Sequence, residues 1–188
     1  MKLGILGGSF NPIHNGHLTI ATRAAEALAL DKVLFTPAAL SPLKEERDLA
    51  SPRDRWAMLK AALRGNPVFA ASDVEIRRGG TSYTIDTLRA LGKRHRNGLH
   101  LIVGADAARL LPQWRSIGEV KRLATIVIVA RPGDSTAPKM PKDPIVVPVP
   151  LLEISSTEIR ERVRRGLSIR YMVPDAVERY VHRKGLYR

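Results

Sequence analysis

The stretch GGSFNPIHNGH, residues 7–17, decides how this chain is organised. A short apolar run that predicts a buried strand precedes it, and an Ala/Leu-rich segment that predicts a helix follows it. Glycines after a strand let the backbone approach a ligand closely, and a helix start offers unpaired N–H groups and a partial positive charge. The stretch therefore predicts an anion site between the first strand and the first helix, and a phosphate suits it best.

Two histidines distinguish this stretch from other phosphate-binding loops. It matches neither G-x-x-x-x-G-K-[ST] nor G-x-G-x-x-G, so it is neither a P-loop nor a dinucleotide fingerprint. His14 and His17 lie about one helical turn apart, where both imidazoles can donate hydrogen bonds to a phosphate chain. A zinc pair is the alternative, although the chain has no cysteine and no evident third ligand. For His14 alone, a capped turn with an incidental histidine stays open.

Beyond this stretch, short apolar segments alternate with helical ones along the whole chain. Strands are expected at 2–6, 33–36, within 68–76, at 99–103, 124–130 and 145–149, and helices at 18–30, 52–64, 83–96, within 105–123, and from 156 and 174 onward. This order predicts an α/β fold with a doubly wound, mostly parallel sheet, helices on both faces and two C-terminal helices. Ligands of such sheets bind beyond the carboxyl ends of the strands.

Length and composition indicate one ordinary globular domain that spans residues 1–188. The chain is 44% apolar and 26% charged. Without cysteine it forms no disulfide, thiolate zinc site or cysteine nucleophile. The first apolar run is too short for a bilayer span, and polar residues follow where a secretory signal would still be apolar. We therefore expect a cytoplasmic protein that does not contact a membrane.

The formal net charge of +13 suits a polyanionic partner, either a nucleoside triphosphate or a nucleic acid. The basic residues are scattered, with some excess after Arg160, and rows of aromatic residues that would stack on bases do not accompany them. Most of the excess is therefore expected to be solvated surface charge. No specific nucleic acid is expected as a partner.

The opening stretch resembles the G-[ST]-F-[ND]-P-x-H-x-G-H element of nucleotidyltransferases that transfer an adenylyl or cytidylyl group. ISSTEIR, residues 154–160, is similar to the second phosphate motif of that superfamily, I-S-[ST]-T-x-I-R, again at a helix start. Ser155 and Glu158 also have the spacing of a capping box. The two roles are compatible, because a capped helix start still leaves N–H groups and neighbouring hydroxyls for phosphate oxygens.

Two further segments narrow the resemblance to one family. GGTSYTIDTL, residues 79–88, resembles the G-G-P-S-Y-T-x-D-T-L segment of bacterial nicotinate mononucleotide adenylyltransferases, and GADAARLLPQW, residues 104–114, resembles their G-x-D followed by a tryptophan. With ARPG at 130–133 and KGLYR at 184–188, the resemblance covers nearly the whole chain. It implies a Rossmann-like nucleotidyltransferase fold and adenylyl transfer from ATP to nicotinate mononucleotide in NAD biosynthesis. It also implies Mg²⁺ on the phosphates, held mainly by substrate and water.

The resemblance assigns roles to three sets of residues. The first set would contact the reacting phosphates and comprises His14, His17, Lys44 and Arg160. The second would bind ATP and comprises Gly8, Ser9, Phe10, Gly104, Asp106, Arg131, Ser155, Ser156 and Thr157. The third would bind the acceptor and comprises Tyr83, Thr84 and Trp114. No residue is assigned to a metal.

General chemistry agrees with the acceptor set. An indole such as that of Trp114 covers a flat pyridine ring, and the helix start at Tyr83 and Thr84 favours a carboxylate. From the residues alone, a core or hinge aromatic is the preferred alternative for Trp114. Asp106 would accept hydrogen bonds from the ribose of ATP, and capping of the short helix that follows is an equal alternative. Residues 41–44 read SPLK where the family often has P-P-H-K, so the lysine is kept and the histidine is lost.

Two alternative functions stay open at this point. The first is that the protein is another adenylyltransferase of the same fold, whose acceptor is nicotinamide mononucleotide or phosphopantetheine. A basic nucleic-acid-binding module would explain the charge, but it leaves both histidines and the phosphate motifs without a purpose. Whether the chain forms a homo-oligomer is also open.

Overall fold

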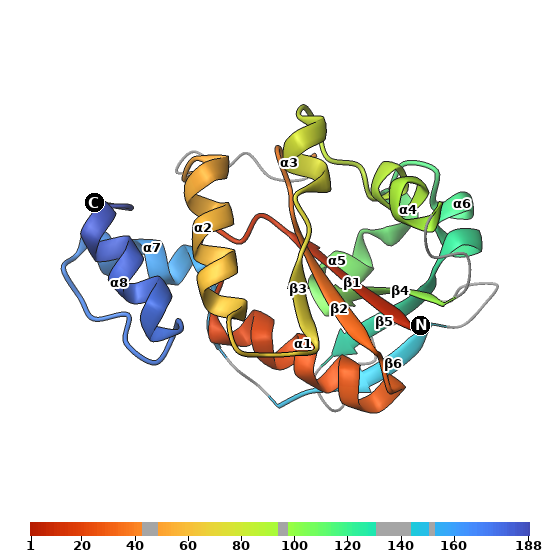
Figure 1. Cartoon of the computed structure of the whole chain (residues 1–188), viewed down its shortest axis with the longest axis horizontal. Helices are drawn as coiled ribbons and strands as arrows, with labels where there is room; N and C mark the ends of the chain where they lie inside the picture. Colours follow the sequence, from red (N-terminus) through yellow and green to blue (C-terminus); the bar gives the residue numbers. More distant parts are fainter. Residues whose placement is uncertain (43–48, 94–97, 131–143, 151–152) are drawn as a thin grey trace.

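Six strands form the sheet of this protein in the order β3-β2-β1-β4-β5-β6, and every pairing between them is parallel. The structure is a computed structural model, and it describes residues 1–42, 49–93, 98–130, 144–150 and 153–188. The strands are β1 (Leu3–Gly8), β2 (Lys32–Pro37), β3 (Phe69–Ala71), β4 (Leu99–Gly104), β5 (Thr125–Ala130) and β6 (Ile145–Pro148). The predicted doubly wound parallel sheet is confirmed (Figure 1).

Helices cover both faces of the sheet. They are α1 (Asn15–Leu28), α2 (Pro52–Leu63), α3 (Val74–Arg78), α4 (Thr84–Gly92), α5 (Ala105–Arg109), the 3₁₀ turn η1 (Leu111–Gln113), α6 (Ile117–Leu123), α7 (Ser156–Arg164) and α8 (Asp175–Lys184). Buried residues of α1, α2, α7 and α8 pack in one core layer with one face of the sheet. Those of α4, α5, η1 and α6 form a second layer on the other face.

Side chains of the central strands alternate between these two layers, as the pleat of a strand requires. Leu3 and Ile5 of β1 lie in the layer with α4 to α6, whereas Leu6 lies in the layer with α1. The C-terminal helices α7 and α8 stand at one end of the molecule, where α8 packs along α2 (Figure 1). The first layer therefore joins the two ends of the sequence.

Two elements differ from the sequence-based expectation. Helix α1 begins at Asn15 rather than at residue 18, because His14 takes the N-cap position with an extended backbone. Within the segment expected to hold the third strand, only residues 69–71 are extended, and Val74–Arg78 form α3. Helix α4 ends at Gly92, Lys93 lies in a turn, and residues 94–96 of the expected helix fall outside the described ranges.

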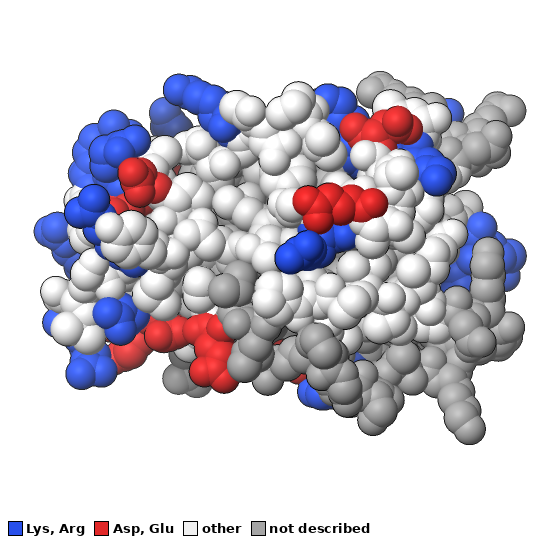
Figure 2. Space-filling view, turned by 90° about the horizontal axis from the view of Figure 1, so that it is seen from below, with Lys and Arg blue, Asp and Glu red and all other residues white. Residues whose placement is uncertain are grey.

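Much of the basic excess near the C-terminus points into solvent. Lys and Arg side chains gather at the end of the molecule that α7 and α8 form, and others stand singly elsewhere on the face that Figure 2 shows. The exposed cations of this end include Arg164, Arg165, Arg170, Arg179, Arg183 and Lys184. None of the helices that the structure describes is long and apolar enough to cross a membrane.

Candidate active site

The predicted phosphate stretch lies at the point where the order of the strands in the sheet reverses. From β1 the chain continues to β2 on one side, while β4 lies on the other side of β1 and leads away to β5. Such a switch point leaves a crevice beyond the carboxyl ends of the two central strands. Gly7 of β1 and Gly104 of β4 border it, and a Cβ atom at either residue would meet no described atom within 4 Å. The backbone is therefore open to a ligand here.

The two histidines stack at this crevice. Their ring centroids are 3.7 Å apart, and the planes are tilted by 32°. Nδ1 of His17 accepts a hydrogen bond from the backbone N–H of His14 at 3.3 Å, as the third residue of a capping box does. Because Nδ1 accepts, the proton of the neutral His17 ring sits on Nε2, which is then a donor. Phe10 packs edge-on against the same ring at 5.0 Å.

His14 is held as a neutral imidazole. Its side chain is buried, with 7% of the residue exposed, and burial lowers the pKa of the imidazole from 6.5 to about 4. Nδ1 of His14 has no hydrogen-bond partner among the residues that the structure describes. Gly16 makes this position possible, because a Cβ atom there would lie 3.0 Å from that nitrogen. A buried ring nitrogen of this kind can still bond to a bound ligand.

The second phosphate motif docks onto the first. Ser155 caps α7, since its Oγ accepts from the backbone N–H of Glu158 at 3.1 Å, so the predicted cap is confirmed. Ser156 Oγ donates to the carbonyl of Pro12 at 2.9 Å. Arg160 Nη1 donates to the carbonyl of Asn11 at 3.0 Å, and its buried Nε has no partner within the described part of the chain. The start of α7 and the histidine stretch thus form one unit.

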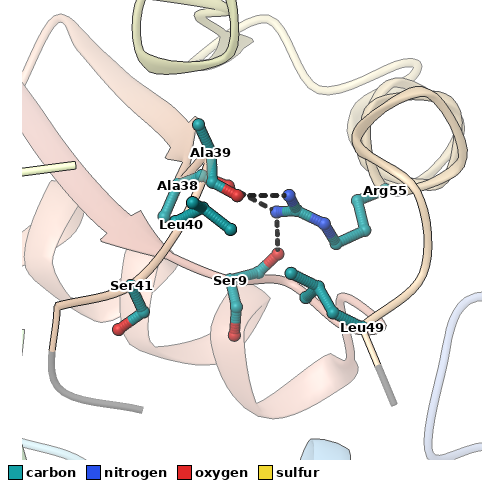
Figure 3. Close-up of a pocket in the computed structure, with 7 residues that line it drawn as sticks. All are labelled: Ser9, Ala38, Ala39, Leu40, Ser41, Leu49 and Arg55. Atoms are coloured by element: carbon teal, nitrogen blue, oxygen red, sulfur yellow. Dashed lines mark hydrogen bonds between the residues drawn. The ribbon is translucent and has the colours of Figure 1, made fainter. Parts of the chain in front are cut away.

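Arg55 of α2 ties three segments of this edge together. The residue is 0% exposed, and its guanidinium donates to the carbonyl oxygens of Ser9, Ala38, Ala39 and Ala50 at 2.6–3.2 Å. Figure 3 shows the side chain reaching from α2 toward the loops that follow β1 and β2. The guanidinium therefore fixes the relative position of these loops.

A cavity of about 80 Å³ lies beside this arginine. Its walls come from the loops after β1 and β2 and from α2, and the lining residues are Ser9, Ala38, Ala39, Leu40, Ser41, Leu49 and Arg55 (Figure 3). Ser9, predicted to bind ATP, is thus one of the residues that line the cavity.

The predicted acceptor segment joins the same edge through Ser82. Ser82 Oγ accepts from the backbone N–H of Ala39 at 2.9 Å, and its own N–H donates to the carbonyl of Leu40 at 2.9 Å. Tyr83 takes the N-cap position of α4, and Thr84 is the first residue of that helix. The helix start that was predicted to receive a carboxylate is therefore held next to the loop after β2.

A buried carboxyl group of α3 contacts helix α4, whose start belongs to the acceptor segment. Glu75 of α3 is 7% exposed, and its Oε1 accepts from Thr87 Oγ1 at 2.6 Å. Burial is the main cause that raises the pKa of the Glu75 carboxyl. The contact joins α3 to α4 behind the acceptor segment.

Trp114 packs beside this segment. It follows η1 and contacts the same core layer as Tyr83. The guanidinium of its neighbour Arg115 lies 4.7 Å from the centre of the Tyr83 ring. Trp114 Nε1 is buried, and no hydrogen-bond partner for it occurs in the described ranges. The tryptophan and the tyrosine of the predicted acceptor set thus belong to one neighbourhood.

The side chain of Asp106 points into solvent. It is 97% exposed and pairs with Arg109 at 2.9 Å, one turn along α5. Gly104 occupies the N-cap position of α5, so the alternative in which Asp106 caps this helix is wrong. Lys44 and Arg131 lie outside the described residues.

The zinc alternative gains no support from the geometry. Across residues 1–42, 49–93, 98–130, 144–150 and 153–188, no group of three or more His, Asp or Glu side chains comes close enough to hold a metal ion. The stacked arrangement of His14 and His17 suits two donors to one anion better than two ligands of one metal.

Comparisons with known proteins identify the family to which this chain belongs. The model of the cytidylyltransferase-like family matches residues 5–162. The probable nicotinate-nucleotide adenylyltransferase of Roseiflexus sp. (strain RS-1) is 47% identical over 194 residues, which cover 99% of this chain and 98% of that protein. The chain belongs to the nicotinate-nucleotide adenylyltransferase family. The probable enzyme of that name from Geobacillus kaustophilus (strain HTA426) is 43% identical over 187 residues, 99% of this chain and 86% of the relative.

Solved structures share the fold of this family member. Plasmodium falciparum nicotinic acid mononucleotide adenylyltransferase complexed with NaAD matches with a TM-score of 0.82 at 19% identity, over 99% of this chain and 97% of that one. A putative nicotinate-nucleotide adenylyltransferase from Vibrio parahaemolyticus matches with a TM-score of 0.74 at 20% identity, over 100% and 96%. The likeness confirms the predicted Rossmann-like nucleotidyltransferase fold.

The two phosphate motifs of this adenylyltransferase are recognisable in its sequence, but the residues that hold them in place are not. Ser156 and Arg160 of α7 contact the backbone of the loop that carries His14 and His17. Arg55 and Asn11 were not singled out as site residues, although both are 0% exposed and bond to segments far away in the sequence. An arginine in a charged helical segment carries no local signal of such contacts.

Proposed function

We propose that this protein transfers the adenylyl group of ATP to nicotinate mononucleotide, giving nicotinate adenine dinucleotide and pyrophosphate in NAD biosynthesis. The observation that carries the proposal is the stacked pair of His14 and His17 at an open, glycine-bordered crevice, with the start of α7 docked on the same loop. Its family relatives are named for this acceptor.

The chemistry needs no protein nucleophile. A 5′-phosphate oxygen of the acceptor attacks the α-phosphorus of ATP, and the bond from that phosphorus to the bridging oxygen of pyrophosphate breaks. The attacking oxygen is already ionised, so no general base is required, and the protein acts by positioning and by stabilising charge. Nε2–H of His17 donates to a phosphate oxygen, while neutral His14 supplies a second imidazole beside it.

Cationic and helix-end groups complete the phosphate site in this proposal. The N–H groups at the start of α7 and the guanidinium of Arg160 face phosphate oxygens. Lys44 and Arg131, which lie outside the described residues, keep the roles that the resemblance implies, on the phosphates and on ATP. Gly104 lets ATP approach the backbone of β4, and the Asp106 carboxylate, which pairs with Arg109 in the structure, accepts hydrogen bonds from the ribose hydroxyls when ATP binds.

Mg²⁺ belongs to the ATP in this proposal. Small hard cations keep several waters and are held largely by substrate phosphates, so they need few protein ligands. The histidine-lined crevice, with no cluster of acidic side chains among the described residues, fits an ion held in that way. The ion would offset the charge that develops on the leaving pyrophosphate.

The acceptor is recognised by its ring and its carboxylate. The helix start at Tyr83 and Thr84 offers N–H donors and a positive field to the carboxylate, and the Trp114 indole covers the pyridine ring. Nicotinamide mononucleotide lacks the carboxylate, and phosphopantetheine lacks the ring. Both should therefore be poorer acceptors.

Pyrophosphate release with ATP and Mg²⁺ tests the proposal. The three acceptors are compared at equal concentration, with His17→Ala as the control for the site. Release with nicotinate mononucleotide alone, lost in the variant, is the expected result. Equal rates with both pyridine nucleotides would disprove the role of Tyr83 and Thr84. No release with any acceptor, together with salt-dependent binding of a random oligonucleotide, would instead favour the nucleic-acid module.

A further inference from the structure

Asn11 is the point at which several distant segments meet the histidine loop. The residue is 0% exposed and lies between Phe10, whose φ of 48° is unusual for a residue with a side chain, and Pro12. Its Oδ1 accepts from the backbone N–H of Ala50 at 3.0 Å and from the hydroxyl of Tyr187 at 2.8 Å. The two lone pairs of this oxygen thus each receive a donor.

Tyr187 reaches Asn11 from the segment that follows the last helix. Helix α8 ends at Lys184, and Gly185 and Leu186 donate back to its final carbonyls at 3.2 and 3.1 Å. Tyr187 has a φ of 65°, a left-handed conformation that is unfavourable for a residue with a Cβ atom. This turn brings the Tyr187 hydroxyl to Asn11 in the loop after β1, 176 positions earlier in the sequence.

The contact is close to groups that the proposed reaction uses. The backbone carbonyl of Asn11 accepts from Arg160, and His14 follows three positions later along the same loop. A change in how Asn11 is held therefore reaches both the guanidinium and the start of α1. Small displacements of donors at a reacting phosphate reduce the rate more than they reduce substrate binding.

We propose that Tyr187 is a positioning residue for the adenylyl transfer, acting through Asn11 on the loop of residues 10–14 and on Arg160. The inference rests on the proposed function, and it adds a residue that neither phosphate motif contains. Tyr187 does not touch the reacting atoms. Its hydroxyl keeps the loop in the geometry that stabilises the transition state.

Tyr180 provides a matched control. Its hydroxyl also donates to an oxygen of another segment, Asp54 Oδ1 at 2.9 Å, and its ring packs against the same core layer as that of Tyr187. The change to phenylalanine removes the hydroxyl bond to Asn11 in one variant and the hydroxyl bond to Asp54 in the other. The Tyr180 bond joins α8 to α2 and does not touch the histidine loop.

The experiment compares Tyr187→Phe with Tyr180→Phe in the whole chain by steady-state pyrophosphate release and thermal unfolding. We expect kcat to fall about fivefold or more for Tyr187→Phe, which is the scale of one lost hydrogen bond. KM for ATP and for nicotinate mononucleotide should stay within about twofold, and the melting temperatures of the two variants should be similar. Tyr180→Phe should keep the kcat of the unmodified protein.

Two results would overturn the inference while leaving the proposed function intact. One is a Tyr187→Phe variant with unchanged kcat. The other is an equal loss of kcat in both variants, which would reflect a general effect on the C-terminal helices. An unmodified protein that releases no pyrophosphate with nicotinate mononucleotide would overturn the proposed function itself and this inference with it.

Discussion

Replacing Gly16 with alanine should separate the geometry of the histidine pair from the stability of the fold. A Cβ atom at Gly16 would lie 3.0 Å from Nδ1 and 3.1 Å from Cε1 of His14, and 3.6 Å from the carbonyl oxygen of Ile154. An ordinary contact begins near 3.4 Å, so the ring must retreat by about 0.4 Å. His14 is buried and already stacks on His17 at 3.7 Å, so the shift is passed to its partner.

The rate should fall far more than the stability of the protein. A misplacement of about 1 Å can cost 10²-fold in rate, so a shift of a few tenths of an ångström should lower kcat about tenfold. Alanine is a better helix former than glycine, and this gain offsets part of the cost of moving a buried ring, so the melting temperature should change little.

Gly118→Ala is the control, because Gly118 holds the same second position of helix α6 and its Cβ atom would meet Arg122 at an ordinary 3.9 Å. The assays are pyrophosphate release and thermal unfolding. A Gly16→Ala variant with the kcat of the unmodified protein would refute the reasoning.

Three further changes test other parts of the site. His17→Ala should lower kcat about 10²-fold, as loss of a transition-state donor does, with the melting temperature little changed; a loss below about threefold would contradict the donor role. His14, with a pKa of about 4 when folded and 6.5 when unfolded, should contribute stability that is fully present above pH 6.5 and is lost as the pH falls toward 4. Denaturant unfolding at several pH values should therefore show the free energy of unfolding rising with pH by up to about 1.4 kcal/mol per pH unit in that window. The His14→Gln variant should lack this contribution, and identical slopes in the two proteins would disprove it. Arg55→Met should lower the free energy of unfolding by about 3 kcal/mol, because buried carbonyl oxygens lose their donor, and Arg55→Lys should recover part of this loss. A loss under about 1 kcal/mol for Arg55→Met would show that the loops keep their positions without the guanidinium.

Local patterns were enough to predict most of the fold. Apolar runs of four to six residues alternate with Ala- and Leu-rich helical segments, and this rhythm gave six strands in the correct order along the chain. Helix α3 was missed because Val74 and Ile76 alternate with Glu75 as they would in a strand. The burial of the Glu75 side chain against Thr87 follows from tertiary contacts that no local pattern contains.

The site was predictable where its chemistry lies in short motifs. His14, His17 and the start of α7 belong to segments with a recognisable spacing, and the structure brings them together. Arg55 and Asn11 instead form hydrogen bonds with residues that are distant in the sequence, and their partners include backbone carbonyl and N–H groups. Such groups occur all along the chain and carry no sequence signal. The local sequence therefore does not indicate their roles. The segment RDRW, residues 53–56 of α2, is typical of a helix that is exposed to solvent.

The place of β1 in the middle of a wholly parallel sheet affects how the protein folds. Parallel neighbours cannot be joined by a tight hairpin, and one neighbour of β1 is β4, with Leu3 opposite Leu99. Contacts between residues so far apart form slowly, because a long loop must close before any stabilisation is gained. The crevice between β1 and β4 therefore cannot exist in a chain whose halves have not yet docked. Binding of nucleotide should report completed folding, and partly folded chains should not compete for ATP.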